Sequence, residues 1–263
     1  MAPRITVVTI CRNVLPALER TVASVLAQDY PGLEYLIVDG ASTDGTTAYL
    51  QTLAVRGVRT LSEPDRGISD AMNKGVRLAT GDWIAHLHAD DEYLPGALAT
   101  VARHIGHTPA DILCGAILQS ERSGEVTCPA APDHLPVEMA IGHPAMWTRR
   151  EVFERFGGFD VSLKNAMDYD FFLRAWLGGA RFAVMPETLT RVAWGGQSER
   201  SLWKTLRETH QIRRRLLPRG FARSPLFLGL LYAKGSVRQG LQALGLAGLV
   251  TAWRRAFSAQ RKR

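Results

Sequence analysis

The sequence has 263 residues, 46% of them hydrophobic, so the chain can bury a full globular core. Its three cysteines, Cys11, Cys114 and Cys128, have neither zinc-site spacing nor the pattern of a disulfide framework, which argues against both classes and favours a reducing compartment. The net charge of +7 is unevenly distributed, because residues 199–263 contain 15 Lys and Arg against 2 Asp and Glu, while residues 1–198 contain 17 against 23. The basic part predicts an anionic partner, either a nucleic acid or a membrane surface.

The first two thirds of the sequence alternate between strand-like and helix-like segments. Residues 4–10 are β-branched and nearly continuous, as in a buried parallel strand, and no long apolar signal segment precedes them, so we expect a protein that is not secreted. This alternation predicts an α/β fold with a mostly parallel sheet. The predicted elements in chain order are strand 4–10, helix 15–28, strand 33–38, helix 48–55, strand 58–61, helix 68–79, strand 83–88, helix 94–105, strands 112–118 and 145–148, helices 151–155 and 168–177, and strand 182–185.

The sequence changes character after Ser198, so we predict a domain of residues 1–198 and a basic helical extension of residues 199–263. Residues 202–217 are expected to form a basic helix that ends in three consecutive arginines. Residues 225–253 are apolar, but two cations interrupt the run, so a spanning helix is not expected. A helix or helix pair lying in a membrane interface is expected, and a buried hairpin packed on the domain is the alternative.

Acidic residues follow three of the predicted strands. Asp39 follows the second strand, Asp65 the third, and Asp90-Asp91-Glu92 the fourth. A turn or a helix cap would explain any one of them. Because the carboxyl ends of parallel strands meet at one edge of a sheet, three together indicate a polar ligand with a divalent cation, since Mg and Mn prefer oxygen ligands. No dinucleotide or P-loop fingerprint is present.

Five successive segments resemble the motifs of the family 2 glycosyltransferases, in order and at suitable separations. The resemblance extends from about residue 4 to residue 198, and it implies the nucleotide-diphospho-sugar-binding fold called GT-A, a Rossmann-like fold with a mostly parallel central sheet. Any one motif is weak, but five in order are specific. The segments are VVTICRN, LIVDGASTDGT, EPDRGISDAMNKGVRLATGDWIAHLHADDEY, GHPAMWTRREVFERFGGFD and AMDYDFFLRAW.

The resemblance implies a nucleotide pocket at the ends of the first strands. Asp39 would accept a hydrogen bond from the ring N–H of a uracil-like base, and helix capping is its alternative role. Arg66 would be available to phosphate or base, although such an arginine is more often a surface ion pair. Lys74 could face the phosphates or be solvated. The expected nucleotide-binding residues are Thr9, Asn13, Asp39, Asp65, Arg66, Lys74 and Asp90.

The segment from His88 to Asp91 resembles the Asp-x-Asp metal motif of the family. The resemblance makes Asp91 the ligand of a divalent metal, Mn or Mg, and Asp90 a ribose contact. The cation would bridge the diphosphate and neutralise the leaving group. Alternation along the strand favours ordinary packing for His86, and the role of His88 stays open.

Asp168 matches the acid regarded as the general base of inverting members, which takes a proton from the acceptor hydroxyl. The family usually has a second acid in place of Met167, and a plain helix cap is the alternative for Asp168. A helix N-terminus lowers the pKa of a carboxylate, so we expect an offsetting hydrophobic environment. Asp170 is expected to be structural, paired with Arg174 one turn later.

The resemblance places His143 beside the acceptor, where it would contact sugar or phosphate, with a structural role as the alternative. Residues 194–198 resemble a loop that closes over the diphosphate. Many relatives have a histidine near this loop as a further metal ligand, and residues 192–198 contain none.

The leading hypothesis is an inverting, metal-dependent glycosyltransferase of cell-surface polysaccharide or O-antigen assembly. Its partners would be a nucleotide-sugar donor, with UDP most frequent in the family, a glycan or polyprenyl-linked acceptor, and an anionic membrane surface, with no nucleic acid expected. The basic extension fits a cytoplasmic protein on the inner face of the membrane, at ~1 kcal/mol per Lys or Arg. The alternatives are a nucleic-acid-binding protein that uses the extension, and a nucleotide-sugar pyrophosphorylase, which would need a Gly-rich loop after the first strand.

Overall fold

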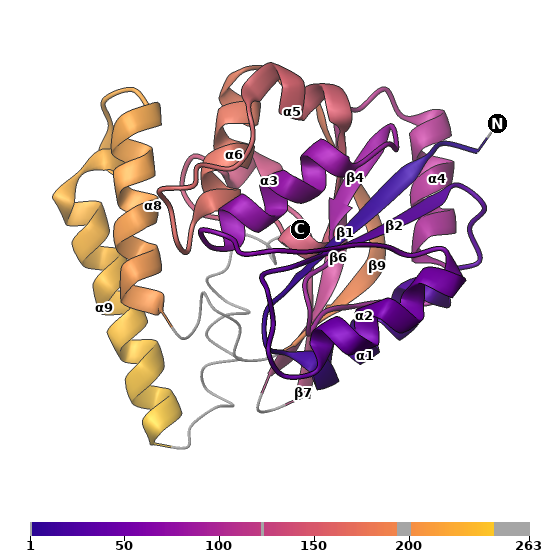
Figure 1. Cartoon of the computed structure of the whole chain (residues 1–263). Helices are drawn as coiled ribbons and strands as arrows, with labels where there is room; N and C mark the ends of the chain where they lie inside the picture. Colours follow the sequence, from indigo (N-terminus) through magenta and orange to yellow (C-terminus); the bar gives the residue numbers. More distant parts are fainter. Residues whose placement is uncertain (1, 122–123, 194–200, 245–263) are drawn as a thin grey trace.

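A nine-stranded sheet with helices on both faces forms the centre of the computed structural model, which describes residues 2–121, 124–193 and 201–244 (Figure 1). The strands are β1 (Ile5–Cys11), β2 (Leu33–Asp39), β3 (Arg59–Ser62), β4 (Trp83–His86), β5 (Glu92–Tyr93), β6 (Ile112–Glu121), β7 (Gly124–Cys128), β8 (Met146–Arg149) and β9 (Phe182–Val192). The α-helices are α1 (Leu15–Leu26), α2 (Thr46–Leu53), α3 (Ile68–Leu78), α4 (Ala97–His107), α5 (Arg150–Phe156), α6 (Met167–Leu177), α8 (Leu202–Leu216) and α9 (Pro225–Ala243).

The strand order is β3-β2-β1-β4-β8-β6-β9-β5, and β7 pairs with β6 outside this path. Strands β3, β2, β1 and β4 are parallel to one another, so their carboxyl ends form one edge. In the rest of the sheet β6 and β9 are parallel to each other, whereas β8 runs antiparallel to both β4 and β6. The predicted α/β class is therefore confirmed, with parallel order concentrated in the first half of the chain.

Alternation along the strands divides the buried side chains between two cores. Val7 and Ile37 face the core covered by α1, α2 and α4, and their chain neighbours Val8 and Leu36 face the core covered by α3, α5 and α6 (Figure 1). Successive side chains of a strand point to opposite faces, so a continuous apolar strand buries both. This arrangement explains why the sequence of β1 shows no polar alternation.

The largest differences from the predicted elements lie in the second half of the chain. Strand β9 runs from Phe182 to Val192, well beyond the predicted end at Met185, because it pairs with β6 through residue 192 and, on its other side, with β5 at residues 190 and 191. Neither β5 nor β7 is expected from the sequence. Strand β5 has two residues, and such a short pairing leaves no periodic pattern to recognise.

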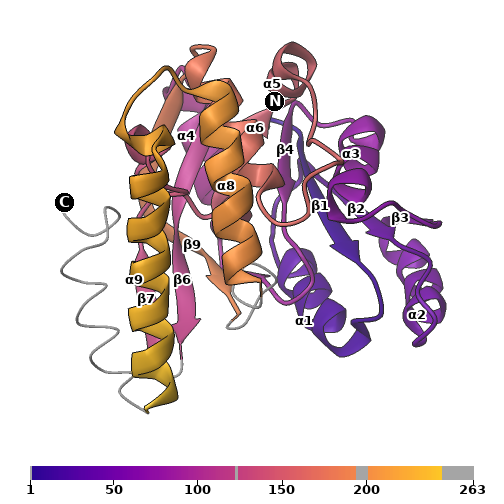
Figure 2. The same cartoon turned by 90° about the vertical axis from the view of Figure 1, so that its left-hand side faces the viewer.

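Helices α8 and α9 lie side by side and are joined to the rest of the protein through α6 (Figure 2). Ile212 and Leu217 are buried in the same core cluster as Phe171 and Phe172 of α6. The predicted helix of residues 202–217 is confirmed, and it packs on the sheet-containing part as a component of its core. Among the described residues, no helix combines the length and hydropathy that crossing a membrane requires. Residues 245–253 of the predicted apolar run lie outside the described residues.

Replacing Gly75 by alanine is expected to lower the free energy of unfolding by about 1–3 kcal/mol, because the new methyl group would overlap the Val8 side chain where α3 packs on β1. Gly106, in helix α4, has open space around it, so Gly106→Ala is the matched control. It should raise the free energy of unfolding by up to about 1 kcal/mol through helix propensity. Urea unfolding of both variants measures the change in the free energy of unfolding relative to wild type. Changes of opposite sign would support the expectation, and changes of the same sign would contradict it.

Candidate active site

The acids that follow β2 and β3 meet at the carboxyl edge of the sheet. Asp39 ends β2 and pairs in register with Ser62 of β3. The Asp65 carboxylate approaches Gly40 so closely that a side chain at residue 40 would collide with it. The structure therefore brings Asp39 and Asp65 together, as the sequence pattern leads one to expect. A glycine at residue 40 is needed for this approach.

The Asp39 carboxylate is fully buried and already accepts several hydrogen bonds from nearby groups. Ser62 Oγ donates over 2.6 Å and the Ser42 backbone N–H over 3.1 Å, and the Ser42 hydroxyl donates as well. Asp65 accepts a hydrogen bond of 2.8 Å from the Gly67 N–H. Both acids thus fix the turns that follow β2 and β3. The Asp39 side chain has no surface exposed to solvent.

The two predicted nucleotide-binding residues in and after β1, Thr9 and Asn13, differ in exposure at this edge. Asn13 is exposed, has a positive φ of 53°, and its Oδ1 accepts a 2.8 Å hydrogen bond from the Thr43 N–H. Thr9 is fully buried, and its hydroxyl lies 3.0 Å from the Tyr35 hydroxyl. Asn13 therefore lies at the surface of the edge, and Thr9 lies beneath it in the core.

Two predicted phosphate-side cations lie on or before α3 in different environments. The Arg66 side chain is 75% exposed and pairs with Asp70 at 3.3 Å. Lys74 is buried, and its Nζ donates to the Pro64 carbonyl over 2.7 Å and lies 2.8 Å from Glu63 Oε1. Lys74 is therefore not solvated and braces the turn that contains Asp65. Arg66 stays accessible at the rim.

The acidic turn after β4 separates its two aspartates. The Asp91 N–H donates to the His88 carbonyl over 3.0 Å, and the Thr21 hydroxyl donates to the Asp91 carbonyl over 2.8 Å. Asp90 takes a φ of 100°, is exposed, and pairs with Arg20 at 3.6 Å. Asp91 is buried instead. The turn thus places one carboxylate in solvent and directs its neighbour inward.

The buried position of Asp91 raises its pKa to about 8. Desolvation is the largest cause, the charges of Asp90 and Glu92 add to it, and a hydrogen bond from the Ala193 N–H opposes it. A carboxylate in such a place is stabilised by a cation. No group of three acid, histidine or cysteine side chains in the described ranges is arranged to hold a metal ion. The residues present suit a cation with one protein carboxylate and substrate phosphates as its remaining ligands, the usual arrangement for Mg.

The rings of three histidines, His86, His88 and His143, lie close together beside this turn. The ring centroids of His86 and His143 are 5.4 Å apart, as are those of His88 and His143. Burial lowers the pKa of all three, to about 3 for His86 and about 4 for His88, so the rings are neutral at pH 7. His86 is packed in the core, as the sequence pattern favours. The convergence of the three rings is not predicted from sequence, because His143 is more than 50 residues away in the chain.

His143 connects the acidic turn to helix α6. Its ring centroid is 5.6 Å from that of Phe172, which lies one helical turn after Asp168. The loop before α6 also contacts the start of α3, because Lys164 Nζ donates to the Arg66 carbonyl over 3.1 Å and the Ser69 hydroxyl donates to the Leu163 carbonyl over 3.1 Å. The N-terminus of α6 therefore lies over the same edge of the sheet as the acidic turn.

Asp168 lies in the first turn of α6 and is partly buried. Desolvation raises its pKa to about 6, and hydrogen bonds from the backbone N–H groups of Tyr169 and of Asp168 itself oppose the rise. Burial thus outweighs the effect of the helix N-terminus, as expected. A carboxylate with a pKa near 6 is mostly ionised at pH 7 and still basic enough to accept a proton.

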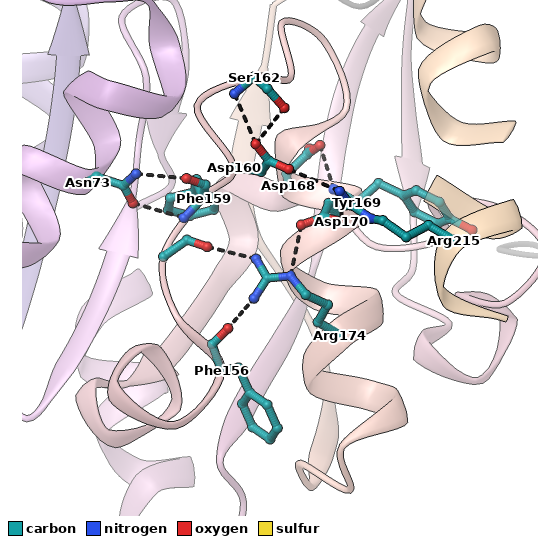
Figure 3. Close-up of polar contacts among 11 residues, drawn as sticks. Asn73, Phe156, Phe159, Asp160, Ser162, Asp168, Tyr169, Asp170, Arg174 and Arg215 are labelled. Carbon is teal, nitrogen blue, oxygen red and sulfur yellow. Dashed lines mark hydrogen bonds and ion pairs between the residues drawn. The ribbon is translucent and has the colours of Figure 1, made fainter. Parts of the chain in front are cut away.

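Three residues that hold α6 and the loop before it were not identified from the sequence, namely Asp160, Glu208 and Arg215. Asp170 is buried and accepts hydrogen bonds from Arg174 Nε, at 2.8 Å, and from Arg215 of α8 (Figure 3). The Arg174 pair was expected, and the Arg215 contact was not. Asp160 lies 3.2 Å from Arg215, and Glu208 of α8 accepts hydrogen bonds from the backbone before α6. No local pattern predicts contacts between segments this far apart in the chain.

The sequence matches a protein-family model and several known proteins. The family model described as Glycosyl transferase family 2 matches residues 6–156. A protein named PGL/p-HBAD biosynthesis glycosyltransferase, from Mycobacterium bovis, is 33% identical over 180 residues, which are 66% of this chain and 70% of that protein. An uncharacterized glycosyltransferase of Mycobacterium tuberculosis is also 33% identical, over 67% of this chain and 70% of its own length.

Solved structures share the fold at lower sequence identity. The mannosyltransferase PcManGT from Pyrobaculum calidifontis, in complex with GDP-Man and Mn2+, aligns with a TM-score of 0.66 and 23% identity, and the alignment covers 98% of this chain and 77% of that one. TarS 1-349 of S. aureus in complex with UDP-GlcNAc aligns with a TM-score of 0.65 and 17% identity, over 82% and 68% of the two chains. The similarity to both structures supports the GT-A fold.

Replacing Asp91 by asparagine is expected to raise the free energy of unfolding near pH 8. The pKa of this carboxyl is about 8 in the folded protein against 3.8 for the ordinary group, so the folded state binds the proton more tightly than the unfolded state. The stability that this group supplies is complete below about pH 4 and is lost as pH rises through about 8. At about 1.4 kcal/mol per pKa unit, the variant should gain a few kcal/mol near pH 8 and nothing near pH 4.

Urea unfolding at several pH values, without divalent cations, measures this difference. Asp90→Asn is the matched control, because Asp90 is adjacent and exposed, and asparagine tolerates its positive φ. A gain in Asp91→Asn that is the same at every pH would contradict a buried, titrating carboxylate at this position.

Proposed function

Because the chain belongs to glycosyl transferase family 2, we propose that it transfers a sugar, with inversion, from a nucleotide-diphospho-sugar to a hydroxyl of a glycan or lipid-linked acceptor. The observation that supports this best is the pair of carboxylates, Asp91 and Asp168, at the carboxyl edge of the sheet. Both have a raised pKa, and His88, His143 and Phe172 link the segments that contain them.

Asp168 is proposed as the general base. The acceptor oxygen attacks the anomeric carbon as the bond from that carbon to the diphosphate oxygen breaks, and the hydroxyl proton passes to Asp168. Attack from the face opposite the leaving group inverts the anomeric carbon. The partial burial of Asp168 keeps its pKa near 6, which suits a base that must be ionised before the reaction and protonated after it.

Asp91 is proposed to hold a divalent cation, Mn or Mg, against the diphosphate. When bound, the cation would neutralise negative charge that develops on the leaving nucleotide. The buried Asp91 carboxylate contributes the negative charge for this purpose, and exposed Asp90 is available to the ribose. The Mn2+ in the complex of the mannosyltransferase PcManGT is consistent with this role.

The nucleotide is proposed to bind over the ends of β1, β2 and β3, where Asn13 and Arg66 are accessible. Asp39 and Lys74 support this surface from beneath, through the bonds to Ser42, Ser62 and Pro64. Thr9 contributes from the core through Tyr35. UDP is the first candidate from its frequency in the family, and TarS, whose complex contains UDP-GlcNAc, has the same fold.

His143 is proposed to lie on the acceptor side, between the acidic turn and α6. Cell-surface polysaccharide assembly, including O-antigen assembly, is the proposed setting. It would place the enzyme on the cytoplasmic face of the membrane with a polyprenyl-linked acceptor.

Membrane association is proposed to involve one face of α9. Exposed apolar side chains at residues 226, 230 and 237 lie within about 40° of one another around the helix, at 100° per residue, and exposed Leu244 directly follows the helix. The exposed fractions range from 52% for Leu230 to 74% for Leu244. Exposed cations on α8, including Lys204, Arg207 and Arg214, would add attraction to anionic lipid, at about 1 kcal/mol each near the surface.

Asp168→Asn is expected to lower kcat by about 10²–10⁴-fold, because asparagine cannot accept the acceptor proton, and to leave the KM for the donor nearly unchanged. In the wild type, kcat/KM should fall as pH drops below about 6, since protonation removes the base. Nucleotide release from UDP-, GDP- and dTDP-sugars with Mn or Mg, using membrane extract as acceptor source, measures both effects.

Asp29→Asn, at an exposed position near the end of α1, is the control and should behave as wild type. Removing divalent cations with a chelator should abolish release, and Mn or Mg should restore it. Full activity in Asp168→Asn would exclude Asp168 as the base. Full activity in the chelated enzyme would exclude the cation.

Leu230→Glu together with Val237→Glu is expected to reduce binding to vesicles of anionic lipid at least about tenfold, because two charges would replace the apolar contact. Co-flotation with vesicles measures binding, and nucleotide release from the donor in the presence of a water-soluble acceptor should be unchanged. Val55→Glu, at an apolar position that is 92% exposed beside α2, is the matched control and should bind like wild type. Equal loss in both variants would exclude α9 as the specific contact.

A further inference from the structure

The backbone that leads into α6 is held by a carboxylate from the C-terminal helical pair. Glu208 of α8 accepts hydrogen bonds from the backbone N–H groups of Asn165, at 2.8 Å, and Ala166, at 3.0 Å. It also accepts from the Lys164 N–H at 3.2 Å and from Asn165 Nδ2 at 3.2 Å. One side chain therefore receives the hydrogen-bond donors of three consecutive residues that end two positions before Asp168.

Glu208 lies at the N-terminus of α6, where no capping side chain of the N-cap residue is present. The N-cap residue is Ala166, which has no side-chain oxygen to accept a hydrogen bond from the first turn. A carboxylate near a helix N-terminus stabilises the free N–H groups there and the positive end of the helix dipole. Glu208 supplies such a carboxylate from a helix more than 40 residues later in the chain.

A second contact from α8 holds the other end of the same loop. Arg215, two turns after Glu208, lies 3.2 Å from Asp160 and also pairs with buried Asp170 (Figure 3). Asp170 pairs in addition with Arg174, whose guanidinium Nη2 donates to the Gly158 carbonyl over 2.7 Å. Both ends of the loop of residues 157–166 are therefore fixed to α8 or α6.

The opposite side of this loop is bonded to α3. The Asn73 side chain donates to the Phe159 carbonyl and accepts from the Phe159 N–H, both at 2.8 Å (Figure 3). Lys164 reaches the carbonyl of Arg66, which is on the proposed nucleotide side. The loop thus lies between α8 and the edge of the sheet, and Asp168 follows it directly.

We propose that Glu208 is a positioning residue for Asp168: its carboxylate holds the backbone of residues 164–166 so that Asp168 lies within reach of the acceptor hydroxyl. This inference rests on the proposed function of Asp168 as the base. It gives helix α8, outside the residues that match the family model, a part in the transfer step. A displacement of about 1 Å at a reacting group is enough to cost about 10²-fold in rate.

Glu208→Ala is expected to lower kcat by about ten- to a hundredfold with the donor KM unchanged, because the donor surface lies on other elements. Glu208→Gln retains one acceptor oxygen but turns an N–H₂ toward backbone donors, so its loss should be smaller, about three- to tenfold. Gln211→Ala, at an exposed position on the same helix, is the control and should match wild type.

Amide hydrogen exchange gives a readout that does not need activity. The amides of residues 164–166 should exchange at least about tenfold faster in Glu208→Ala than in wild type, and the amides of β1 should be unchanged. Circular dichroism and thermal unfolding establish that each variant is folded at the assay temperature. Unchanged exchange at residues 164–166 would overturn the proposal, as would faster exchange with an unchanged kcat.

A double variant separates positioning of Asp168 from a general structural effect. If Glu208 acts through Asp168, Glu208→Ala should cause little further loss of kcat in an Asp168→Asn background. Full, additive losses in the double variant would overturn the proposal. If Asp168→Asn lowers kcat as expected but Glu208→Ala does not, the inference about Glu208 fails and the proposed function stands. If Asp168→Asn retains full activity, the proposed function of Asp168 fails first.

Discussion

Two carboxyl groups withdrawn from water at one edge of the sheet are the constraint on which the rest of the site depends. Burial raises the pKa of Asp91 to about 8 and that of Asp168 to about 6, so folding opposes the negative charge at both positions. Charge at a buried acid is stabilised by a cation or by hydrogen-bond donors. The fold supplies donors to both groups, since the Ala193 N–H reaches Asp91 and the Tyr169 N–H reaches Asp168. At Asp91 the proposed divalent cation would supply the remaining stabilisation.

The neutral interior beside the two acids has a consequence for their pKa values. His86, His88 and His143 are uncharged at pH 7, and aromatic rings such as Phe159 and Phe172 surround them. A neutral, aromatic wall adds little electrostatic stabilisation to either acid. It therefore preserves the raised pKa values.

Composition alone does not separate the cations of the C-terminal segment that take part in folding from those that are available to the proposed membrane contact. Arg213 is buried, donates to the Val137 carbonyl and lies over Tyr169, and Arg215 pairs with buried Asp170. Arg213 is part of the folded core, and Arg215, although half-exposed, is held by Asp160 and Asp170, whereas Arg214 between them is exposed. Any attraction to anionic lipid therefore falls to the exposed cations and to the apolar face of α9. Family membership also identifies the chain as a glycosyltransferase, so its basic charge does not indicate nucleic-acid binding as its main function.

The sequence by itself determined the α/β class, the family and the identity of the acids at the strand ends. Local signals are sufficient for these, because buried parallel strands are continuous apolar runs and the motifs are short and contiguous. Thr9 and Lys74 show the limit of sequence motifs. A motif identifies these residues but does not give the direction in which their side chains point. Only the tertiary structure decided that Asp91 is buried while Asp90 is exposed, through a positive φ in one turn.

The tertiary structure alone also decided how α6 is held. Glu208 meets residues 164–166, and Arg215 meets Asp160 and Asp170, across separations of more than 40 residues. Such contacts follow from the packing of α8 against α6 through Ile212 and leave no periodicity or motif in the chain. The sequence could therefore indicate Asp168 as the candidate base, and the folded protein was needed to show what fixes the backbone beside it.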